Sequence, residues 1–385
     1  MKYDFNKPTE RRGTGSYKWD IAPNSDIIPL WVADMDFEAA PAIQNAIKKR
    51  VEHGVYGYVK VPEEYYEASI RWFASRHNWR FKREWMTYTI GVVPAISAII
   101  KAFTQPGDKV IVQTPDYNCF FSSIRNNGCE IVENPLRRVS DTYEMDYDDL
   151  EQKAKDSKAK VLILCNPHNP AGRVWKKDEL TRLAEICIKH HVIIVSDDIH
   201  CELVMPGNCY TPLPSLSEEF QHQCISCISP SKSFNIAGLQ IANIVTDNPE
   251  WLEKINKAIN INEVCDVNPF GVVALMAAYN ESGDWIDQLC HYLHGNYTLL
   301  CEFFSKHFPQ FPVTKLEGTY IAWIDIKASG MSSDDFTQQL LEKAHVWVNS
   351  GTMYGANDGE GFIRINLATQ RAKLQEALNR MAKVL

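Results

Sequence analysis

The sequence predicts an α/β protein built on a mostly parallel central sheet, with a smaller α+β domain beside it. Short apolar runs rich in Val and Ile alternate with amphipathic segments, and this alternation changes near residue 285. The chain of 385 residues also exceeds the length at which one hydrophobic core usually stops growing, so we expect two domains.

The first part of the pattern indicates repeated strand–helix–strand units. The expected buried strands are Lys109–Thr114, Lys160–Cys165, Val192–Asp197, Cys224–Ser229 and Gln240–Thr246. The expected helices between and after them are Pro94–Phe103, Lys177–His190 and Trp251–Asn260. Strands joined by helical crossovers pair in parallel. We therefore place a large domain at residues 50–285.

A different pattern follows residue 285. A long helix is expected over Trp285–His307, a second over Ser333–Ala344 and a third at the end of the chain. The apolar segments between and after them are Phe311–Leu316, Tyr320–Ile326, Val346–Val348 and Phe362–Asn366. The first 49 residues supply no strand to the central sheet. We assign residues 1–49 and 286–385 together to the small domain.

The composition argues against a nucleic-acid or acidic-membrane partner. A net charge of −8 with scattered basic residues provides no positive surface for a polyanion. No apolar run reaches the ~18–20 residues of a spanning helix, and no signal-peptide pattern follows Met1. The eleven cysteines, an odd number, are therefore expected to be reduced thiols of a cytoplasmic protein.

One cysteine pair has the spacing of a metal or redox motif. Cys224 and Cys227 are three positions apart, but they lie in a predicted buried strand. No second pair completes a four-ligand site. Buried structural thiols explain the pair better, and we expect no metal site.

Lys232 has the most informative surroundings of any residue in the chain. It lies in the polar loop Ser229–Leu239, which begins where a predicted buried strand ends. Burial disfavours the charged form of a lysine, and the neutral amine can form a Schiff base. A surface-loop lysine is the commoner case for a lysine considered alone. The hydroxyls of Ser229 and Ser231, which suit a bound phosphate, favour the functional interpretation.

Two carboxylates end another predicted strand. Asp197 and Asp198 lie at the edge where ligands bind in open α/β sheets. A carboxylate facing a pyridine nitrogen would hold it protonated and keep the ring an electron sink. A helix cap or a solvated turn explains Asp198 equally well, and Asp197 less well.

Two further segments could bind a cofactor of this kind. Asn166–Gly172, with two Asn-Pro pairs and a glycine, is expected to form a rigid turn, and its Asn169 amide could donate to a phenolate-like oxygen. Gly91–Ala95 precedes a helix, whose exposed first amides suit a phosphate. Every helix has such an end, so the second signal is weak alone.

Two single residues complete the set. Arg364 is a lone cation within the apolar strand Gly361–Asn366, and its planar guanidinium matches a substrate carboxylate. An ordinary buried salt bridge is the main alternative. Tyr117 lies just past a predicted strand and could stack on a cofactor ring, although aromatic residues more often belong to a core.

As an ordered set these residues resemble a known family. From about residue 28 to the end, the chain resembles the fold-type I pyridoxal-phosphate enzymes, the aspartate aminotransferase superfamily. Within it, the chain looks most like the cystathionine β-lyase branch of MalY and PatB type, also called cystalysin-like C–S lyases. This closer resemblance rests on Pro29–Phe37, Tyr56–Tyr58, Gly91–Ile96, Asp198–His200 and Gly318–Tyr320.

The resemblance implies a pyridoxal 5′-phosphate cofactor bound to the large domain as a Schiff base on Lys232, which would also move the substrate's α-proton. Asp197 would pair with the pyridine nitrogen, and Asn169 would bond the ring hydroxyl oxygen with His200 beside it. Tyr117 would stack on the ring. The phosphate would be held by Val92, Val93, Ser229 and Ser231.

The resemblance also implies a homodimer and a mode of substrate binding. Tyr58 would reach the phosphate from the neighbouring subunit. Arg364 would bind the α-carboxylate of a small amino-acid substrate, with the loop at Ala33 closing over it and Tyr117 nearby.

Three positions depart from the family pattern. Gln240, eight positions after the lysine, stands where many aminotransferases have a phosphate-binding arginine, and this change fits the lyase branch better. Asp198 stands where a glutamate is more usual. Asn118 stands where some C–S lyases have a second aromatic residue.

The resemblance favours α,β-elimination from cystathionine or another S-substituted L-cysteine, which gives a thiol, pyruvate and ammonia. An aminotransferase would use the same lysine, aspartate and arginine, so these residues alone do not separate the two. A regulatory protein that binds pyridoxal phosphate and has weak lyase activity is a second alternative.

Overall fold

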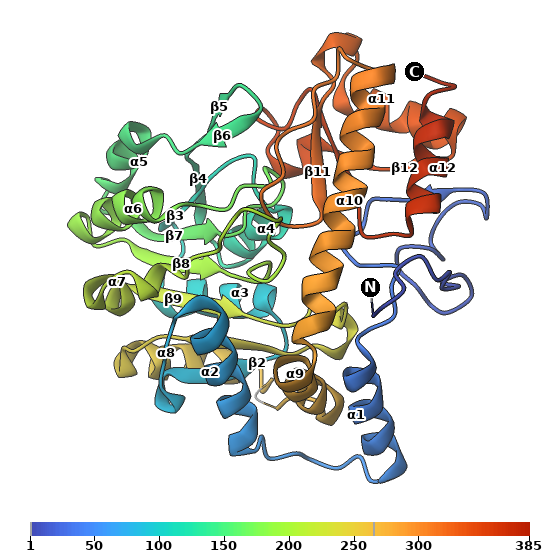
Figure 1. Ribbon diagram of the computed structural model, residues 1–385. Coiled ribbons are helices and arrows are strands. Elements are labelled where there is room, and N and C mark those ends of the chain that lie inside the picture. The colour runs from blue at the N-terminus through green and yellow to red at the C-terminus, as the bar shows by residue number, and fades with distance from the viewer. Residues whose placement is uncertain (1, 265) are drawn as a thin grey trace.

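The computed structural model describes residues 2–264 and 266–385. A seven-stranded sheet with the order β2-β10-β9-β8-β7-β3-β4 lies at its centre (Figure 1). Its strands are β2 (Met86–Thr89), β3 (Lys109–Val112), β4 (Glu130–Glu133), β7 (Ala159–Cys165), β8 (Ile193–Asp197), β9 (Cys224–Ile228) and β10 (Ala242–Val245). Only β10 runs antiparallel to its neighbours, so the predicted mostly parallel sheet is confirmed.

The parallel pairing brings the carboxyl ends of the strands to one edge. Asp197, the last residue of β8, lies beside Cys165 at the end of β7 and beside Cys227 on β9. The loops that follow these strands therefore start side by side. This register places the predicted site residues of the large domain close together.

Different helices cover the two faces of the sheet, because successive residues of a strand point to opposite faces. Leu162 and Leu164 of β7 pack in the apolar cluster that includes α5, α6 and α7. Val161 and Ile163 pack in the cluster that includes α3, α4 and α8. These helices are α3 (Val92–Phe103), α4 (Asn118–Asn126), α5 (Tyr147–Ala154), α6 (Lys177–Lys189), α7 (Glu218–Gln223) and α8 (Pro249–Asn260).

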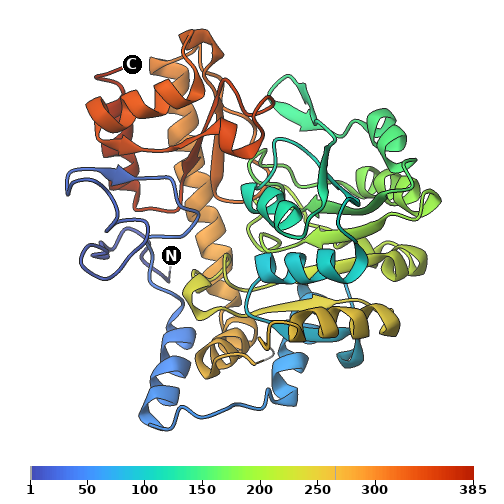
Figure 2. The same ribbon diagram turned by 180° about the vertical axis from the view of Figure 1, so that it is seen from behind.

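The C-terminal part contains a three-stranded antiparallel sheet with the order β11-β14-β13. Its elements are α10 (Gly283–His307), β11 (Ile321–Asp325), α11 (Ser333–Gln339) with a π-helical turn at Leu340–Ala344, β13 (Asn349–Ser350), β14 (Phe362–Asn366) and α12 (Arg371–Met381). In addition, β1 (Ile28–Pro29) pairs in parallel with β12 (Val346–Trp347). The N-terminal segment thus lies beside the C-terminal part (Figure 2). The domain boundaries at residues 50 and 285 stay a prediction, which this pairing supports.

Three more α-helices and a hairpin lie outside these groups. The helices α1 (Pro41–Glu52), α2 (Glu63–His77) and α9 (Pro269–Glu281) pack together, with α9 between the other two. The hairpin consists of β5 (Arg137–Val139) and β6 (Thr142–Glu144). None of the described helices is long and apolar enough to cross a membrane. The ten described cysteines are all free, and Cys224 and Cys227 are buried in β9 as expected.

Two expected segments differ in the structure. Phe311–Leu316 forms no strand and makes one isolated bridge, between Val313 and Ile324, because Pro312 within it has no N–H for a ladder. The strand expected from Gln240 begins at Ala242, because Gln240 has the left-handed backbone angle φ 51° that ends a short helical turn.

Candidate active site

The candidate site lies at the carboxyl edge of the central sheet, where residues from five strand ends converge. Asp197 ends β8, whereas Lys232 lies in the loop after β9. Asn169 follows β7, and Tyr117 immediately precedes α4 in the connection from β3. Val92 begins α3 just after β2. The sheet topology therefore brings together residues that are up to 140 positions apart (232 − 92 = 140).

The amine of Lys232 points at the loop that follows β1. Its Nζ donates a hydrogen bond to the carbonyl oxygen of Ala33 at 2.7 Å. The hydroxyl of Tyr320 donates to the same oxygen at 2.8 Å. Burial lowers the pKa of Lys232, and the carboxylates of Asp34 and Asp197 oppose this shift. The amine is thus oriented by two neighbours and held closer to its neutral form.

Asp197 is buried and makes no ion pair with any described residue. Its Oδ1 accepts a hydrogen bond from the backbone N–H of Ile199 at 3.1 Å. Burial raises the pKa of Asp197 to about 7. Burial also raises the pKa of Asp198 to about 6, and this side chain accepts from the Ser196 hydroxyl at 2.8 Å. Asp198 is fully buried, so the solvated-turn interpretation of it is wrong.

Arg364 is a buried cation on β14 that pairs with no carboxylate among the residues that the structure describes. Its Nη2 donates to the carbonyl oxygen of Trp31 at 2.7 Å, and its Nη1 donates to Oδ1 of Asn169 at 3.3 Å. Its guanidinium carbon lies 4.6 Å from the ring centroid of Tyr354. Its Nε is buried without a hydrogen-bond partner. The salt-bridge alternative is therefore wrong, and the guanidinium can bind an added carboxylate.

Asn169 and His200 face the same region from neighbouring loops, and both are buried. The carbonyl oxygen of the Asn169 side chain accepts from Arg364, which leaves its NH₂ group to donate elsewhere. The ring centroid of His200 lies 5.8 Å from that of Tyr320. Burial lowers the pKa of His200 to about 3, so this imidazole is neutral at physiological pH.

The start of α3 is a candidate anion site. No described side chain caps this helix, so the backbone N–H groups of Val92 and Val93 could donate to an acceptor. Ser229 and Ser231 are hydrogen-bonded to each other within the adjoining loop. The Ser229 hydroxyl donates to the carbonyl oxygen of Ile241 at 2.7 Å and accepts from the backbone N–H of Ser231 at 3.1 Å.

Tyr58 and Gln240 lie apart from this group. Tyr58 is 100% exposed, in the extended loop between α1 and α2, and it contacts no other predicted site residue within this chain. Gln240 is exposed at the end of the turn after Lys232. Tyr117 is partly buried, and its ring packs edge-on against Phe120 at 5.6 Å.

The structure also adds residues that were not singled out from the sequence. Tyr354 and Asn349 surround Arg364, and Asn349 donates to both the Tyr354 hydroxyl (2.8 Å) and the Trp31 carbonyl (3.1 Å). Tyr320 lies in the Gly318–Tyr320 segment, one of those that carry the family resemblance, so that resemblance could have pointed to it. No sequence motif marks Tyr354.

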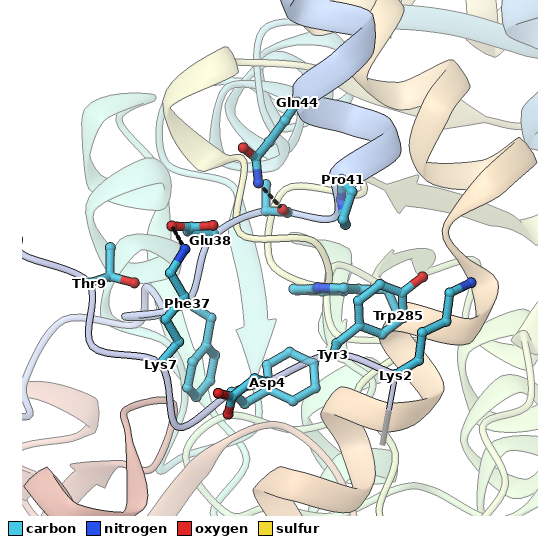
Figure 3. A pocket seen from close by; sticks show the side chains of 12 residues that line it. Lys2, Tyr3, Asp4, Lys7, Thr9, Phe37, Glu38, Pro41, Gln44 and Trp285 are labelled. Atoms are coloured by element: carbon cyan, nitrogen blue, oxygen red, sulfur yellow. Dashed lines mark hydrogen bonds and ion pairs between the residues drawn. The ribbon is translucent and has the colours of Figure 1, made fainter.

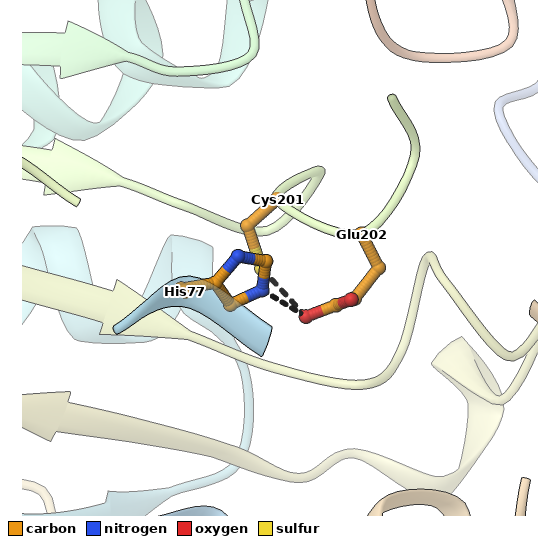
Figure 4. A group of neighbouring side chains, drawn as sticks. All are labelled: His77, Cys201 and Glu202. Atoms are coloured by element: carbon orange, nitrogen blue, oxygen red, sulfur yellow. Dashed lines mark hydrogen bonds and ion pairs between the residues drawn. The ribbon is translucent and has the colours of Figure 1, made fainter. Parts of the chain in front are cut away.

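Behind the site, Glu202 forms a buried charge cluster with the end of α2 (Figure 4). Its carboxylate accepts from Trp72 Nε1 at 2.6 Å and from Arg76 Nε at 2.9 Å, and it lies 2.5 Å from His77 Nε2. The side chains of His77, Cys201 and Glu202 lie close enough together that they could surround a metal ion. Because three donors already occupy the carboxylate, we interpret the cluster as an anchor for the segment that carries His200.

The chain is similar to known proteins over nearly its whole length. Residues 25–381 match the family model described as aminotransferase class I and II. The chain is 40% identical to cystathionine beta-lyase PatB of Bacillus subtilis, over 99% of this chain and 100% of that protein.

Solved structures match over almost the whole chain. Cystalysin from Treponema denticola, whose structure contains a pyridoxal 5′-phosphate cofactor, superposes with a TM-score of 0.97 and 36% identity over 100% of this chain and 99% of that one. A pyridoxal-phosphate-bound putative aminotransferase from Clostridium difficile 630 gives a TM-score of 0.96 and 40% identity, over 99% of each chain. The chain therefore belongs to the aminotransferase class I and II family and, within it, to the group of PatB and cystalysin.

Proposed function

We propose that this protein is a pyridoxal-phosphate-dependent C–S lyase. It would cleave cystathionine or another S-substituted L-cysteine by α,β-elimination to a thiol, pyruvate and ammonia. The observation that carries the proposal is the joint placement of Lys232 and Arg364, which both bond to the loop containing Trp31 and Ala33, while Arg364 pairs with no carboxylate of the described residues. The names of PatB and cystalysin support the choice of reaction.

The residues present fit the cofactor. Burial raises the pKa of Asp197, and a protonated pyridine nitrogen would supply the missing cationic partner. The uncapped start of α3 would hold the phosphate through the N–H groups of Val92 and Val93, with Ser229 and Ser231 shaping the adjoining loop. The NH₂ group of Asn169 would donate to the ring hydroxyl oxygen, with His200 beside it and Tyr117 against the ring. When bound, the cofactor withdraws electrons from the substrate's α-carbon.

The protein's own groups would then position the substrate and move its proton. Arg364 would bind the α-carboxylate through its unpartnered edge, and the Ala33 loop and Tyr117 would enclose it. Because burial lowers its pKa, the Lys232 amine can accept the α-proton at Nζ. The Ala33 carbonyl and Tyr320 hydroxyl would fix the direction of that amine.

The experiment that tests the proposal separates elimination from transamination. The cofactor-loaded protein is incubated with L-cystathionine without any 2-oxo acid, and pyruvate and free thiol are followed together. We expect equimolar release over many turnovers, and none from Lys232→Ala. Product formation that begins only after a 2-oxo acid is added would instead assign the protein as an aminotransferase.

We further propose a homodimer in which Tyr58 reaches the phosphate site of the neighbouring subunit. The complete exposure of Tyr58, next to the exposed Val55 and Tyr56, supports this role. Mixing the two inactive variants Lys232→Ala and Tyr58→Ala should restore activity, because some mixed dimers contain one intact site. No recovery under conditions that exchange subunits would contradict a shared site.

Two further proposals concern organisation and location. We propose a cofactor-binding domain at residues 50–285 and a small domain made of residues 1–49 and 286–385. We also propose a cytoplasmic protein, and the free thiols of the ten described cysteines support a reducing compartment.

A further inference from the structure

One loop touches both principal groups of the site. We call residues 31–36 the site loop. Its Ala33 carbonyl accepts from Lys232 at 2.7 Å, and its Trp31 carbonyl accepts from Arg364 at 2.7 Å. The side chain of Asn366 donates to the carbonyl of Asp34 at 2.7 Å. The position of this backbone therefore sets where the Lys232 amine and the Arg364 guanidinium point.

The other side of the site loop is bound by charges from the N-terminal turn, which we define as residues 11–20. Arg11 bonds to the Asp34 carboxylate at 2.7 Å and donates to the Met35 carbonyl at 2.6 Å. Lys18 lies 3.0 Å from the Asp36 carboxylate and 3.6 Å from that of Asp34. Two cations thus face two carboxylates of the site loop.

These ion pairs are unlike exposed surface pairs. The side chain of Lys18 is 0% exposed and that of Asp36 is 1% exposed. Asp36 is also bonded by the indole N–H of Trp19 at 2.8 Å. Removing one partner of a buried pair leaves an uncompensated charge, which is far more costly than losing a pair in water. The N-terminal turn must therefore stay docked for the site loop to keep its shape.

The N-terminal turn is itself an organised unit. The carboxylate of Asp20 accepts from the backbone N–H groups of Gly13 (2.8 Å) and Ser16 (2.9 Å). Arg12 donates to the carbonyls of Trp19 (3.0 Å) and Ile27 (2.6 Å). These bonds do not involve the site loop. They should therefore keep the turn folded when its ion pairs to the site loop are removed.

Asp34 links this cluster to the chemistry of the site. Its carboxylate raises the pKa of Lys232 against the larger effect of burial. Arg11 and Lys18 oppose that effect because they neutralise the same carboxylate.

We propose that Arg11 and Lys18 are positioning residues of the active site. Acting through Asp34 and Asp36, they hold the site loop so that its carbonyls orient Lys232 and Arg364. Docking of the loop is independent of the reaction catalysed, whereas the effect on substrate binding rests on the proposed function.

A neighbouring pair supplies a matched control. Lys7 bonds to Glu38 at 2.8 Å where the first residues pack against α1 and α10 (Figure 3). Both side chains are about half exposed or more (60% and 49%), so this is a surface pair just beyond the site loop. Lys7→Gln removes a cation from the same N-terminal segment without touching Asp34 or Asp36.

The first test is amide hydrogen exchange of the cofactor-free protein, which needs no assumption about activity. Arg11→Gln should speed exchange of the amides at residues 30–37 by about tenfold or more, with Arg11→Lys intermediate and Lys7→Gln unchanged. Should Arg11→Gln fail to fold, Asp34→Asn removes the Arg11–Asp34 pair while Arg11 keeps its 3.1 Å pair with Asp36, and it should speed exchange there by a smaller factor. Exchange at wild-type rates in Asp34→Asn would overturn the proposal.

The second test uses the absorbance of the bound cofactor as a function of pH. Arg11→Gln removes a positive charge and should move the midpoint of the spectral change to higher pH, whereas Asp34→Asn should move it to lower pH. A purely structural role would not give opposite shifts. Arg11→Gln should also raise KM for the amino acid more than it lowers kcat. Shifts of the same sign in both variants, or none, would refute the assigned route through Asp34.

Discussion

Arg364 offers a test of the site that couples activity to stability. We expect Arg364→Met to abolish most activity while leaving the protein about as stable as before. The two results together separate a substrate-binding cation from a structural one, because a structural arginine would lose stability as well. Arg173 is the matched control. It is also buried, but it is paired with Glu317 at 2.8 Å and with Glu179 at 2.8 Å.

The magnitudes follow from the contacts. Arg364→Met loses hydrogen bonds to Trp31 and Asn169, worth about 1 kcal/mol each. It also removes a buried charge that has no carboxylate partner among the described residues, a relief of similar or greater size. The net change in the free energy of unfolding should therefore lie within about 1 kcal/mol of zero. Arg173→Met leaves Glu179 without its cation and Glu317 with only the half-exposed Lys315, and it should cost about 3–5 kcal/mol.

The effect on activity is larger. Losing a charge-assisted contact to the substrate carboxylate costs about 3 kcal/mol, hence a roughly hundredfold lower kcat/KM. Steady-state kinetics and urea unfolding of the cofactor-free variants measure the two quantities. The reasoning fails if Arg364→Met keeps kcat/KM within threefold of wild type. It also fails if Arg364→Met is destabilised as much as Arg173→Met.

Three further predictions concern other buried charges and the cofactor. Burial raises the pKa of Asp197 to about 7, so the folded cofactor-free protein holds a proton that the unfolded chain releases near its ordinary pKa of about 4. The free energy of unfolding should therefore fall as pH rises from about 4 to 7, and urea titrations of Asp197→Asn should show a shallower fall. Bound cofactor should also flatten this dependence, since a protonated ring nitrogen stabilises the carboxylate; an unchanged slope would contradict the assigned pairing. Glu202→Gln should lower the free energy of unfolding by about 1–3 kcal/mol, because Arg76 and His77 lose their buried partner while Arg76 keeps Asp287 at 2.6 Å, and a stable variant would show that the cluster is no anchor.

Much of the fold could be predicted because its central strands are continuous apolar runs. The predicted segments at β3, β7, β8 and β9 agree with the structure to within two residues at each end. The edge strand β4 was missed because its sequence, Glu130–Glu133, carries a charge at both ends and is only half buried. Edge strands need less apolar surface, so periodicity alone does not reveal them.

The site was predictable where its residues follow strands and less so where distant segments meet. Asp197 ends a predicted strand, Lys232 and Asn169 lie in the loops that follow two others, and parallel pairing then brings them together. Tyr354 could not be found in this way. It reaches Arg364 because β13 pairs with β14 in a register that sets Asn349 opposite Arg364, and no local pattern encodes that register.

The distribution of buried charge gives an independent reason to place the site here. Several deep charges of the described chain are closely compensated: Lys18 faces two carboxylates, Arg173 faces two, and Glu202 accepts from three donors. Arg364 is the contrast among the buried cations, since it pairs with no carboxylate of the described residues. Asp197 also lacks an opposite charge among them, as does the neighbouring Asp198. An uncompensated buried cation costs several kcal/mol, so Arg364 is best explained by a ligand of opposite charge that completes it, and Asp197 lies close enough to the Lys232 amine to face the same ligand. A carboxylate for Arg364 and a cationic ring nitrogen for Asp197 are the two charges that an amino acid and pyridoxal phosphate together supply.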